Sequence, residues 1–522
     1  MTTGLYAVIA VIAVYLIGMV LIGYWFSKKN ETSGDFYLGG RKLGPFVTAM
    51  SAEASDMSSW LLMGLPGVAY LTGIAEAFWT ALGLAVGTYI NWLLVAKPLR
   101  QYSEKIGAIT IPDFFSKRFG DNKNVLTLIA AVVIIVFFVP YTASGFVACG
   151  KLFSTMFEVP YVTAMIISAI VIVLYTALGG FLAASTTDFI QSIVMTIALV
   201  VVLAFGINYA GGWEAVAENA KSLEGYLDLT KTFNVATKVQ GDYNALTIAS
   251  TLAWGLGYFG MPHVLLRFMA VNDENKLKTS RRVATVWVVI SLAVATIIGI
   301  VGYAMTMSNK GFPQLFSFKE NGDLINDSQN VIIEIAKLMS QNPTLTVVFA
   351  CLAGLILSGI LASTMSTADS QLLAASSSVS ENILRDFLKL KISEKTAMLI
   401  ARISVVIIAV VAAVLALNPE SSVFEIVSFA WAGFGAAFGP VVLFALFWKR
   451  TTKGGALAGM ITGGALVFLW KFVIAKAGGV FAIYELLPAF ILACIAIVVV
   501  SLLTKKPEKE ITDTFEAVKA GK

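Results

Sequence analysis

Runs of about twenty apolar residues recur along the whole chain between short polar segments, and they constrain its fold more than any other feature. An α-helix needs about twenty such residues to cross the hydrocarbon core of a bilayer. Of the 522 residues, 58% are hydrophobic and only 13% are charged. Soluble domains carry about 25% charged residues, so this chain has too few polar groups to cover its surface in water. We therefore expect it to fold within a lipid bilayer.

The apolar runs predict thirteen transmembrane helices and hence an all-α multi-pass membrane protein. The expected ranges are 5–26, 44–73, 75–96, 124–150, 160–180, 188–210, 246–266, 283–307, 346–380, 397–417, 423–447, 454–476 and 483–504. The first range is expected to be a membrane helix and not a signal peptide. No Lys or Arg precedes it, and Ser27, Lys28 and Lys29 follow it where a small-residue cleavage site would stand.

Basic residues are divided unevenly between the two sides of the predicted helices. With the N-terminus outside, the inner segments hold 28 of the 37 Lys and Arg residues, and the outer segments hold 9. Loops on the cytoplasmic side of multi-pass proteins carry such an excess. We expect a protein of the cell (plasma) membrane with its N-terminus outside and its C-terminus in the cytoplasm. Because topology accounts for the net charge of +5, that charge indicates no nucleic-acid partner.

Two of the predicted spans are interrupted by residues that do not suit a lipid-facing helix. The second contains a polar run at 51–59 with Glu53 and Asp56 near mid-membrane, where a charge costs about 2.5–3.5 kcal/mol. The seventh contains WGLGYFGMPH at 254–263, whose three glycines and one proline weaken the helical hydrogen bonds. Interrupted helices at matching places in two halves of a membrane protein point to a transporter built from inverted repeats.

The positions of the two interruptions predict how the chain is divided. We expect a core of two inverted five-helix repeats with broken first helices and a central binding site. The expected regions are 1–43 with the first transmembrane helix and an inner loop, 44–210 and 246–447 with the two repeats, 454–504 with two additional helices, and 505–522 with a cytoplasmic tail.

The ninth span carries an unusual number of hydroxyl groups. Ser363, Ser366 and Ser370 lie on one helical face with Thr367 beside them. Oxygen ligands without imidazole or thiolate suit a hard alkali cation. Hydroxyls in membrane helices also bond to their own helix or join neighbouring helices, and the residues alone leave both interpretations open. The stripe Trp254, Tyr258 and Pro262 is similarly either packed core or part of a ligand pocket.

Six sequence blocks resemble the solute:sodium symporter family, and within it the bacterial sodium/proline symporters. They are GGRKLGPF (39–46), SDMS (55–58), WLLMGLPG (60–67), WGLGYFGMPH (254–263), MST (365–367) and WAGFGAAFGP (431–440). The resemblance covers nearly the whole chain. It implies thirteen helices, inverted repeats, and uptake of L-proline driven by a co-transported sodium ion.

The resemblance also implies roles for particular residues. The main sodium site would use the backbone carbonyls of Ala54, Met57 and Ser363 and the hydroxyls of Ser366 and Thr367. The positions linked to proline binding are Ser58, Tyr141, Trp254, Tyr258 and Pro262, and those linked to coupling are Arg41, Asp56 and Asp188. A possible second cation would lie near Asp188, Ser366, Asp369 and Ser370.

The chain departs from the family pattern at three positions. Glu53 and Ser59 stand where the best-known member has glycine, so the substrate pocket could be narrower or more polar. Glu53 could equally be a structural acid satisfied by a neighbouring backbone donor. Asp369 stands where a small hydroxyl residue is usual, and it could pair with a basic residue at the inner end of its helix.

Three other functions compete with sodium-coupled proline uptake. A sodium symporter for another small amino or organic acid would share the cation site. A solute sensor usually needs a signalling domain, and the tail from Thr504 to Lys522 is short for one. We do not expect an enzyme, because the single histidine, His263, has no accompanying nucleophile motif such as G-x-S-x-G. The scattered cysteines Cys149, Cys351 and Cys494 suggest no metal site or disulfide framework.

Overall fold

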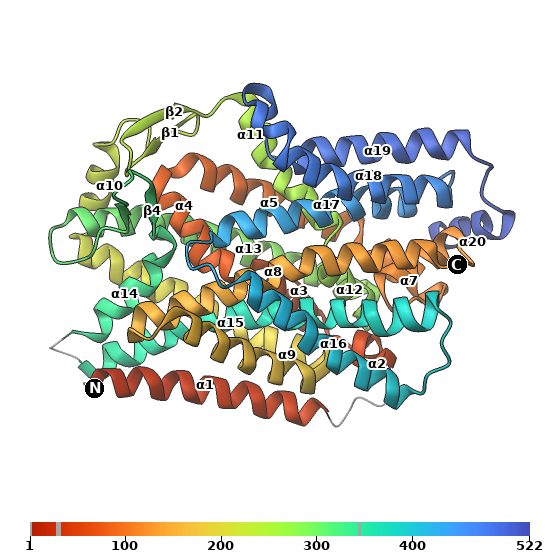
Figure 1. Ribbon diagram of the computed structural model, residues 1–522, viewed down its shortest axis with the longest axis horizontal. Coiled ribbons are helices and arrows are strands. Elements are labelled where there is room, and N and C mark those ends of the chain that lie inside the picture. Colours follow the sequence, from red (N-terminus) through yellow and green to blue (C-terminus); the bar gives the residue numbers. More distant parts are fainter. Residues whose placement is uncertain (1–2, 28–32, 343–345, 522) are drawn as a thin grey trace.

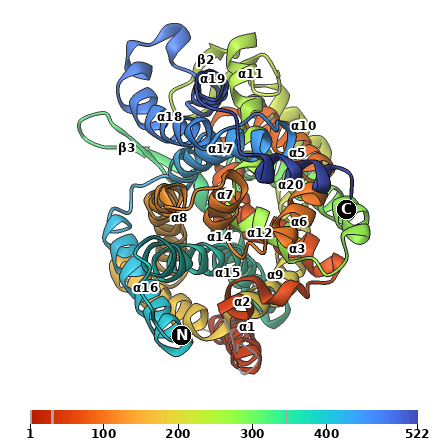
Figure 2. The same cartoon turned by 90° about the vertical axis from the view of Figure 1, so that its right-hand side faces the viewer.

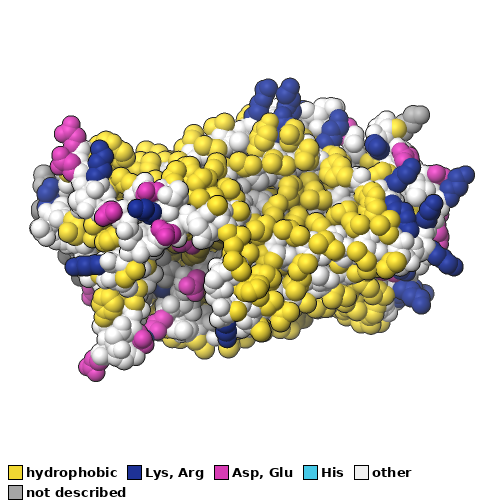
Figure 3. Space-filling view, turned by 90° about the horizontal axis from the view of Figure 1, so that it is seen from above, with side chains coloured by type: hydrophobic (Ala, Val, Ile, Leu, Met, Phe, Trp, Pro, Cys, Tyr) yellow, Lys and Arg dark blue, Asp and Glu magenta, His cyan; other side chains and the backbone are white. Residues whose placement is uncertain are grey.

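The computed structural model describes residues 3–27, 33–342 and 346–521, and most of them are helical. The long helices run roughly parallel to the longest axis of the molecule, and the two termini lie at opposite ends of it (Figure 1). Viewed along that axis, α1 and α16 lie at the rim and α12 lies near the centre (Figure 2). The space-filling view shows a broad hydrophobic band between two polar ends, with Lys and Arg gathered at the right-hand end (Figure 3).

The helices of the first half of the chain are α1 (Thr3–Ser27), α2 (Ser33–Leu38), η1 (Gly39–Arg41), α3 (Pro45–Ser59), η2 (Trp60–Gly64), α4 (Leu65–Thr72), α5 (Ile74–Leu94), α6 (Ala96–Lys105), α7 (Ile111–Phe119), α8 (Val125–Phe157), α9 (Tyr161–Ala210) and α10 (Trp213–Lys221). The second half begins with α11 (Ala245–Leu252), η3 (Ala253–Phe259), α12 (Pro262–Ala270), η4 (Glu274–Lys276), α13 (Leu277–Met307), η5 (Ser328–Asn330) and α14 (Val331–Ser340). It continues with α15 (Thr346–Ser377), η6 (Ser378–Phe387), α16 (Glu394–Leu415), α17 (Val423–Phe447), α18 (Lys453–Phe472), η7 (Ile474–Ala477), η8 (Gly479–Phe481), α19 (Leu486–Leu503) and α20 (Lys509–Lys519).

Within the described residues, ten helices are long and apolar enough to cross a membrane, and Tyr161–Leu174 and Ala245–Phe259 are shorter apolar helices. Helices at the rim, such as α1, α16 and α19, present large hydrophobic side chains outward, as expected for contact with lipid. Helix α15 differs, because almost every residue from Ala350 to Ser377 is buried among α1, α3, α8, α9 and α14. The protein is therefore a multi-pass helical membrane protein with α15 in its interior.

Both predicted interruptions are present. In α3, Ser58 has φ +47°, a left-handed conformation that is rare for a residue with a side chain, and the one-turn π-helix η2 follows. The seventh predicted span is divided into α11, the 3₁₀ segment η3 and α12, which begins at Pro262. At Gly87 of α5, an added Cβ would lie 2.4 Å from Cα of Gly255, so the backbones of α5 and η3 are in direct contact.

Two expectations about loops were wrong. The predicted inner loop 181–187 is helical, because α9 consists of two helices that meet directly at Gly180, whose backbone is not helical (φ +69°, ψ −176°), with no loop between them. Arg267, expected in an inner loop, lies in α12 and is buried, since it has an acidic partner inside the protein.

The predicted outer loops 211–245 and 308–345 contain two short antiparallel hairpins, β1 (Lys231–Asn234) with β2 (Val239–Asp242) and β3 (Phe316–Phe318) with β4 (Leu324–Asn326), which satisfy backbone hydrogen bonds away from the helices. Lys28 and Lys29, expected to anchor the first helix, lie outside the described residues.

Candidate functional site

The interrupted helix α3 contacts the hydroxyl-rich helix α15 in the interior. The hydroxyl of Ser366 donates to the backbone carbonyl of Ala54 at 2.9 Å, and it also approaches the carbonyl of Ser363 at 3.2 Å. The Thr367 hydroxyl donates to the same Ser363 carbonyl at 3.1 Å. The carbonyl of Met57 accepts the backbone N–H of Trp60 just after the break. The five residues expected to hold sodium are all buried, and two of them, from different helices, bond directly.

Asp56 is held by tyrosines from two other helical segments. The Tyr258 hydroxyl, on η3, donates to Oδ2 of Asp56 at 2.6 Å. The Tyr141 hydroxyl, on α8, donates to the backbone carbonyl of Asp56 at 3.0 Å. The structure thus brings Asp56, Ser58, Tyr141 and Tyr258 together at the point where α3 is broken. The other carboxylate oxygen of Asp56, Oδ1, is buried without a hydrogen-bond partner.

Aromatic rings pack beside this break. The Trp254 ring lies 5.4 Å from that of Trp60, 5.5 Å from Phe424 and 5.2 Å from Tyr484, measured between centroids. The indole N–H of Trp431 donates to the Trp254 carbonyl at 2.7 Å. Phe424 and Tyr484 were missed by the sequence reasoning, while Trp431 begins one of the blocks that carry the family resemblance. Pro262 begins α12 four residues after Tyr258.

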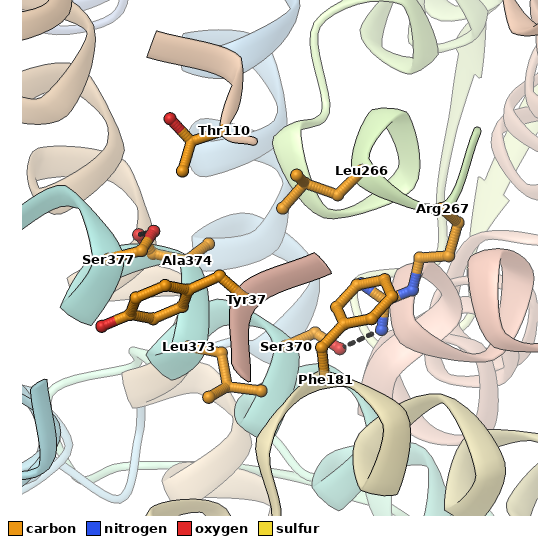
Figure 4. A pocket seen from close by; sticks show the side chains of 9 residues that line it. All are labelled: Tyr37, Thr110, Phe181, Leu266, Arg267, Ser370, Leu373, Ala374 and Ser377. Carbon is orange, nitrogen blue, oxygen red and sulfur yellow. Dashed lines mark hydrogen bonds between the residues drawn. The ribbon is translucent and has the colours of Figure 1, made fainter. Parts of the chain in front are cut away.

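Cavities lie on both sides of the break. One is lined by Gly64, Glu76, Phe424 and Glu425 and includes Ser328 of η5. Phe424 also stacks on Trp60, so this cavity borders the group of aromatic rings around Trp254. The second is lined by residues that include Tyr37, Thr110, Phe181, Arg267 and Ser370, and Figure 4 shows Arg267 and Ser370 linked across it. Ser370 lies one helical turn after Ser366 on α15. The broken helix therefore lies between two cavities.

A buried ion pair lies beside the second cavity. Arg267 pairs with Asp188 at 3.0 Å, and the two side chains are 1% and 0% exposed. The same guanidinium donates to the Ser370 hydroxyl at 2.6 Å, and Ser370 in turn donates to Asp369 at 3.1 Å. Ser51, the first residue of the polar run 51–59 in α3, donates a hydrogen bond to Asp188 at 2.7 Å.

This cluster includes three of the four residues expected near a second cation. Ser366 is the exception, because it bonds to Ala54. No salt bridge between Asp369 and a basic residue is seen among the described residues. Arg267, on α12, forms its ion pair with Asp188 and reaches Asp369 through Ser370. Sequence reasoning gave Arg267 no role in the site.

Glu53 accepts hydrogen bonds from side chains and not from the backbone, through one of its two carboxylate oxygens. Its Oε1 accepts hydrogen bonds from the Thr88 hydroxyl at 2.9 Å and from the Trp92 indole at 2.8 Å, both on α5. One residue before Trp92, the Asn91 amide donates to the Tyr258 carbonyl at 3.1 Å. Helix α5 therefore links the two interrupted segments.

Arg41 ends η1, in the segment between α2 and α3. Its guanidinium donates to the backbone carbonyls of Met269 at 2.5 Å and Ala108 at 2.7 Å. Burial is the main cause that lowers the pKa of Arg41 to about 10. Arg41 thus joins the segment before α3 to the end of α12, the helix that carries Arg267.

Interrupted helices that meet around buried polar groups between two cavities are typical of secondary membrane transporters. The fold is similar to that of a solved Na⁺-coupled sialic acid symporter, with a TM-score of 0.77, 17% sequence identity, and coverage of 96% of this chain and 99% of that one. The model of the sodium:solute symporter family matches residues 36–463. The chain belongs to this family.

Two relatives are similar along nearly their whole length. The sodium/proline symporter of Haemophilus influenzae is 44% identical over 507 residues, which are 96% of each chain. The osmoregulated proline transporter OpuE of Bacillus subtilis is 42% identical over 505 residues, again 96% of each chain.

Proposed function

We propose that this protein takes up L-proline across the cell membrane together with sodium, by alternating access. The observation that carries the proposal is the 2.9 Å contact between the Ser366 hydroxyl and the Ala54 carbonyl, because it joins the interrupted helix to the hydroxyl-rich one. Proline as the substrate is supported by relatives at 42–44% identity that are named sodium/proline symporter and proline transporter.

The proposed architecture has thirteen transmembrane segments, with inverted repeats at 44–210 and 246–447. Ten long and two shorter apolar helices, together with the interrupted α3–α4 segment, overlap the thirteen predicted ranges and support this count. The remaining proposed regions are 1–43, two additional helices within 454–504, and an inner tail at 505–522. The termini at opposite ends and the basic side chains at the C-terminal end support an external N-terminus and a cytoplasmic C-terminus (Figures 1 and 3).

Sodium would be bound where α3 meets α15. Its ligands would be the carbonyls of Ala54, Met57 and Ser363 and the hydroxyls of Ser366 and Thr367. All are oxygen atoms, which suits an alkali ion. An ion held there joins α3 to α15 and so stabilises the break in α3, beside which proline would bind. By linkage the effect is reciprocal, and a coupling of about 1–3 kcal/mol changes each affinity about 5–150-fold.

Proline would bind beside the break in α3. The positive φ of Ser58 interrupts the backbone hydrogen bonds of the helix, and backbone N–H groups released at such a break can hold a carboxylate. The ring of proline would pack among Tyr141, Trp254, Tyr258 and Pro262. The first three contact Asp56 or Trp60 at the break, and Pro262 begins the helix that follows η3. Asp56 would couple this pocket to the sodium site, because it lies between Ala54 and Ser58 and accepts the Tyr258 hydrogen bond.

A second cation near Asp188, Ser366, Asp369 and Ser370 has weaker support. Arg267 already neutralises Asp188, and Ser366 bonds to Ala54. We propose instead that Asp188 contributes to coupling through Arg267 and Ser51, which link α9, α12 and the start of the polar run in α3. Arg41 would contribute by holding the end of α12.

Binding of labelled proline to the purified protein tests this function. Proline should bind in sodium and should bind far more weakly in potassium at the same ionic strength. Unlabelled proline should displace the label better than other small amino or organic acids. Better displacement by another solute would instead favour a sodium symporter for that solute.

A further inference from the structure

Two carboxylates in the interrupted helix have no basic partner. Glu53 and Asp56 lie three residues apart on α3, so they are on the same side of the helix, and their exposed fractions are 0% and 5%. Among residues 3–27, 33–342 and 346–521, no Lys, Arg or His forms a salt bridge with either of them. Asp188, in contrast, is neutralised by Arg267 at 3.0 Å. A buried carboxylate without a compensating charge is unfavourable, so these two require a cationic ligand or protonation.

Each carboxylate has one oxygen that is hydrogen-bonded and one that is not. Oε1 of Glu53 accepts two hydrogen bonds from α5, and Oδ2 of Asp56 accepts one from Tyr258. Oε2 of Glu53 and Oδ1 of Asp56 are buried without a hydrogen-bond partner. The hydrogen bonds orient both groups and leave one oxygen of each available to a ligand.

A third unpartnered oxygen belongs to the same set of contacts. The side chain of Asn91 is 0% exposed, and its Nδ2 donates to the Tyr258 carbonyl at 3.1 Å, which leaves its Oδ1 without a partner. Three hydrogen bonds connect the two carboxylates through other elements: Glu53 accepts from Trp92 on α5, Asn91 on α5 donates to Tyr258, and Tyr258 donates to Asp56. Because Gly87 and Gly255 have no side chains, the backbones of α5 and η3 lie in direct contact, which holds the residues of these hydrogen bonds close together.

We propose that Glu53, Asp56 and Asn91 bind a sodium ion in addition to the one between α3 and α15. The three available atoms are all oxygens, two of them carboxylate oxygens, and such a set prefers a hard cation. The ion neutralises a pair of charges that nothing else in the described protein neutralises. The inference rests on the proposed sodium coupling and extends it: if both ions move with proline, a given sodium gradient supports a steeper accumulation of substrate.

Counting bound sodium tests this inference. The purified protein is titrated with ²²Na⁺, and the bound ions per polypeptide are compared between the wild type, Glu53→Gln and Glu76→Gln. Glu76→Gln makes the same chemical change on α5, at the cavity lined by Gly64 and Phe424, and we expect it to bind as many ions as the wild type. Glu53→Gln should bind one ion fewer over the concentration range that saturates the wild type. An unchanged number of bound ions in Glu53→Gln overturns the proposal. It would mean that water or a proton, and not sodium, occupies the space between the carboxylates.

Two further variants separate ion binding from packing. Thr88→Val combined with Trp92→Phe removes the donors that orient Glu53 and keeps its carboxylate, so the affinity should fall while the wild-type count is retained at saturating sodium. Loss of one ion from this double variant would assign Glu53 a packing role and overturn the proposal. Asn91→Ala keeps both charges and removes one ligand, so one ion should bind at least threefold more weakly, and unchanged affinity would also contradict it. These counts need no proline, so a protein that failed to bind proline would refute the proposed function while still deciding this inference.

Discussion

Removing the hydroxyls of Ser366 and Thr367 should weaken sodium binding without changing the maximal rate of transport. Both side chains are buried on α15, and the Ser366 hydroxyl forms the hydrogen bond that joins this helix to the Ala54 carbonyl. Each hydroxyl would provide one ligand to sodium. A polar contact of this kind contributes about 1 kcal/mol, so the double change Ser366→Ala with Thr367→Ala should cost about 2 kcal/mol of sodium binding.

Since 1.4 kcal/mol is a factor of ten in affinity, this loss corresponds to a roughly 30-fold rise in the sodium concentration for half-maximal uptake. The assay is the initial rate of labelled-proline uptake into proteoliposomes as external sodium is varied. At saturating sodium, the maximal rate and the apparent affinity for proline should return close to the wild-type values.

Ser358→Ala is the matched control on the same helix. The Ser358 hydroxyl donates to the Gly354 carbonyl of α15 itself at 2.8 Å, so its loss should leave the sodium requirement almost unchanged. If the double variant behaved like this control, α15 would provide no sodium ligands and the proposed site would be wrong.

Three further changes test other parts of the site. Tyr258→Phe removes a 2.6 Å hydrogen bond to a carboxylate, worth about 1.5–3 kcal/mol, so the KM for proline should rise at least tenfold in uptake assays. Arg267→Leu leaves Asp188 buried without its partner at a cost of about 3–5 kcal/mol, and the melting temperature of the purified protein should fall clearly. Gly257→Ala places a Cβ 2.0 Å from the Trp431 indole nitrogen and should abolish measurable proline binding. A wild-type KM for Tyr258→Phe, a wild-type melting temperature for Arg267→Leu, or a wild-type proline affinity for Gly257→Ala would contradict the respective expectation.

The interruptions of α3 and of the α11–α12 segment were predictable because their signals are local. Polar residues at 51–59 and three glycines with a proline at 254–263 are exceptional within apolar runs, and each directly weakens a membrane helix. The kink at Gly180 was not predictable in the same way. Gly179 and Gly180 form a pair that could mark a hinge, but glycine is common in membrane helices, and the pair alone does not indicate that two helices meet there without a loop.

The partners of the buried charges were not predictable, because they are distant in sequence. Asp188 and Arg267 are 79 residues apart, and Arg267 follows an apolar run in the position of an ordinary inner-side basic residue. Glu53 meets Trp92 through the packing of two helices whose contact the sequence does not specify. Phe424 and Tyr484 carry no signal, since isolated aromatic residues are frequent throughout a chain with 11% of them.

Uptake of labelled proline into proteoliposomes under an imposed ion gradient tests the central claim most directly. With sodium outside and potassium inside, proline should accumulate above its external concentration, and a membrane potential negative inside should increase the accumulation. With potassium on both sides, the label should do no more than equilibrate slowly. Equal accumulation in the two conditions, or none in either, would contradict sodium-coupled proline transport by this protein.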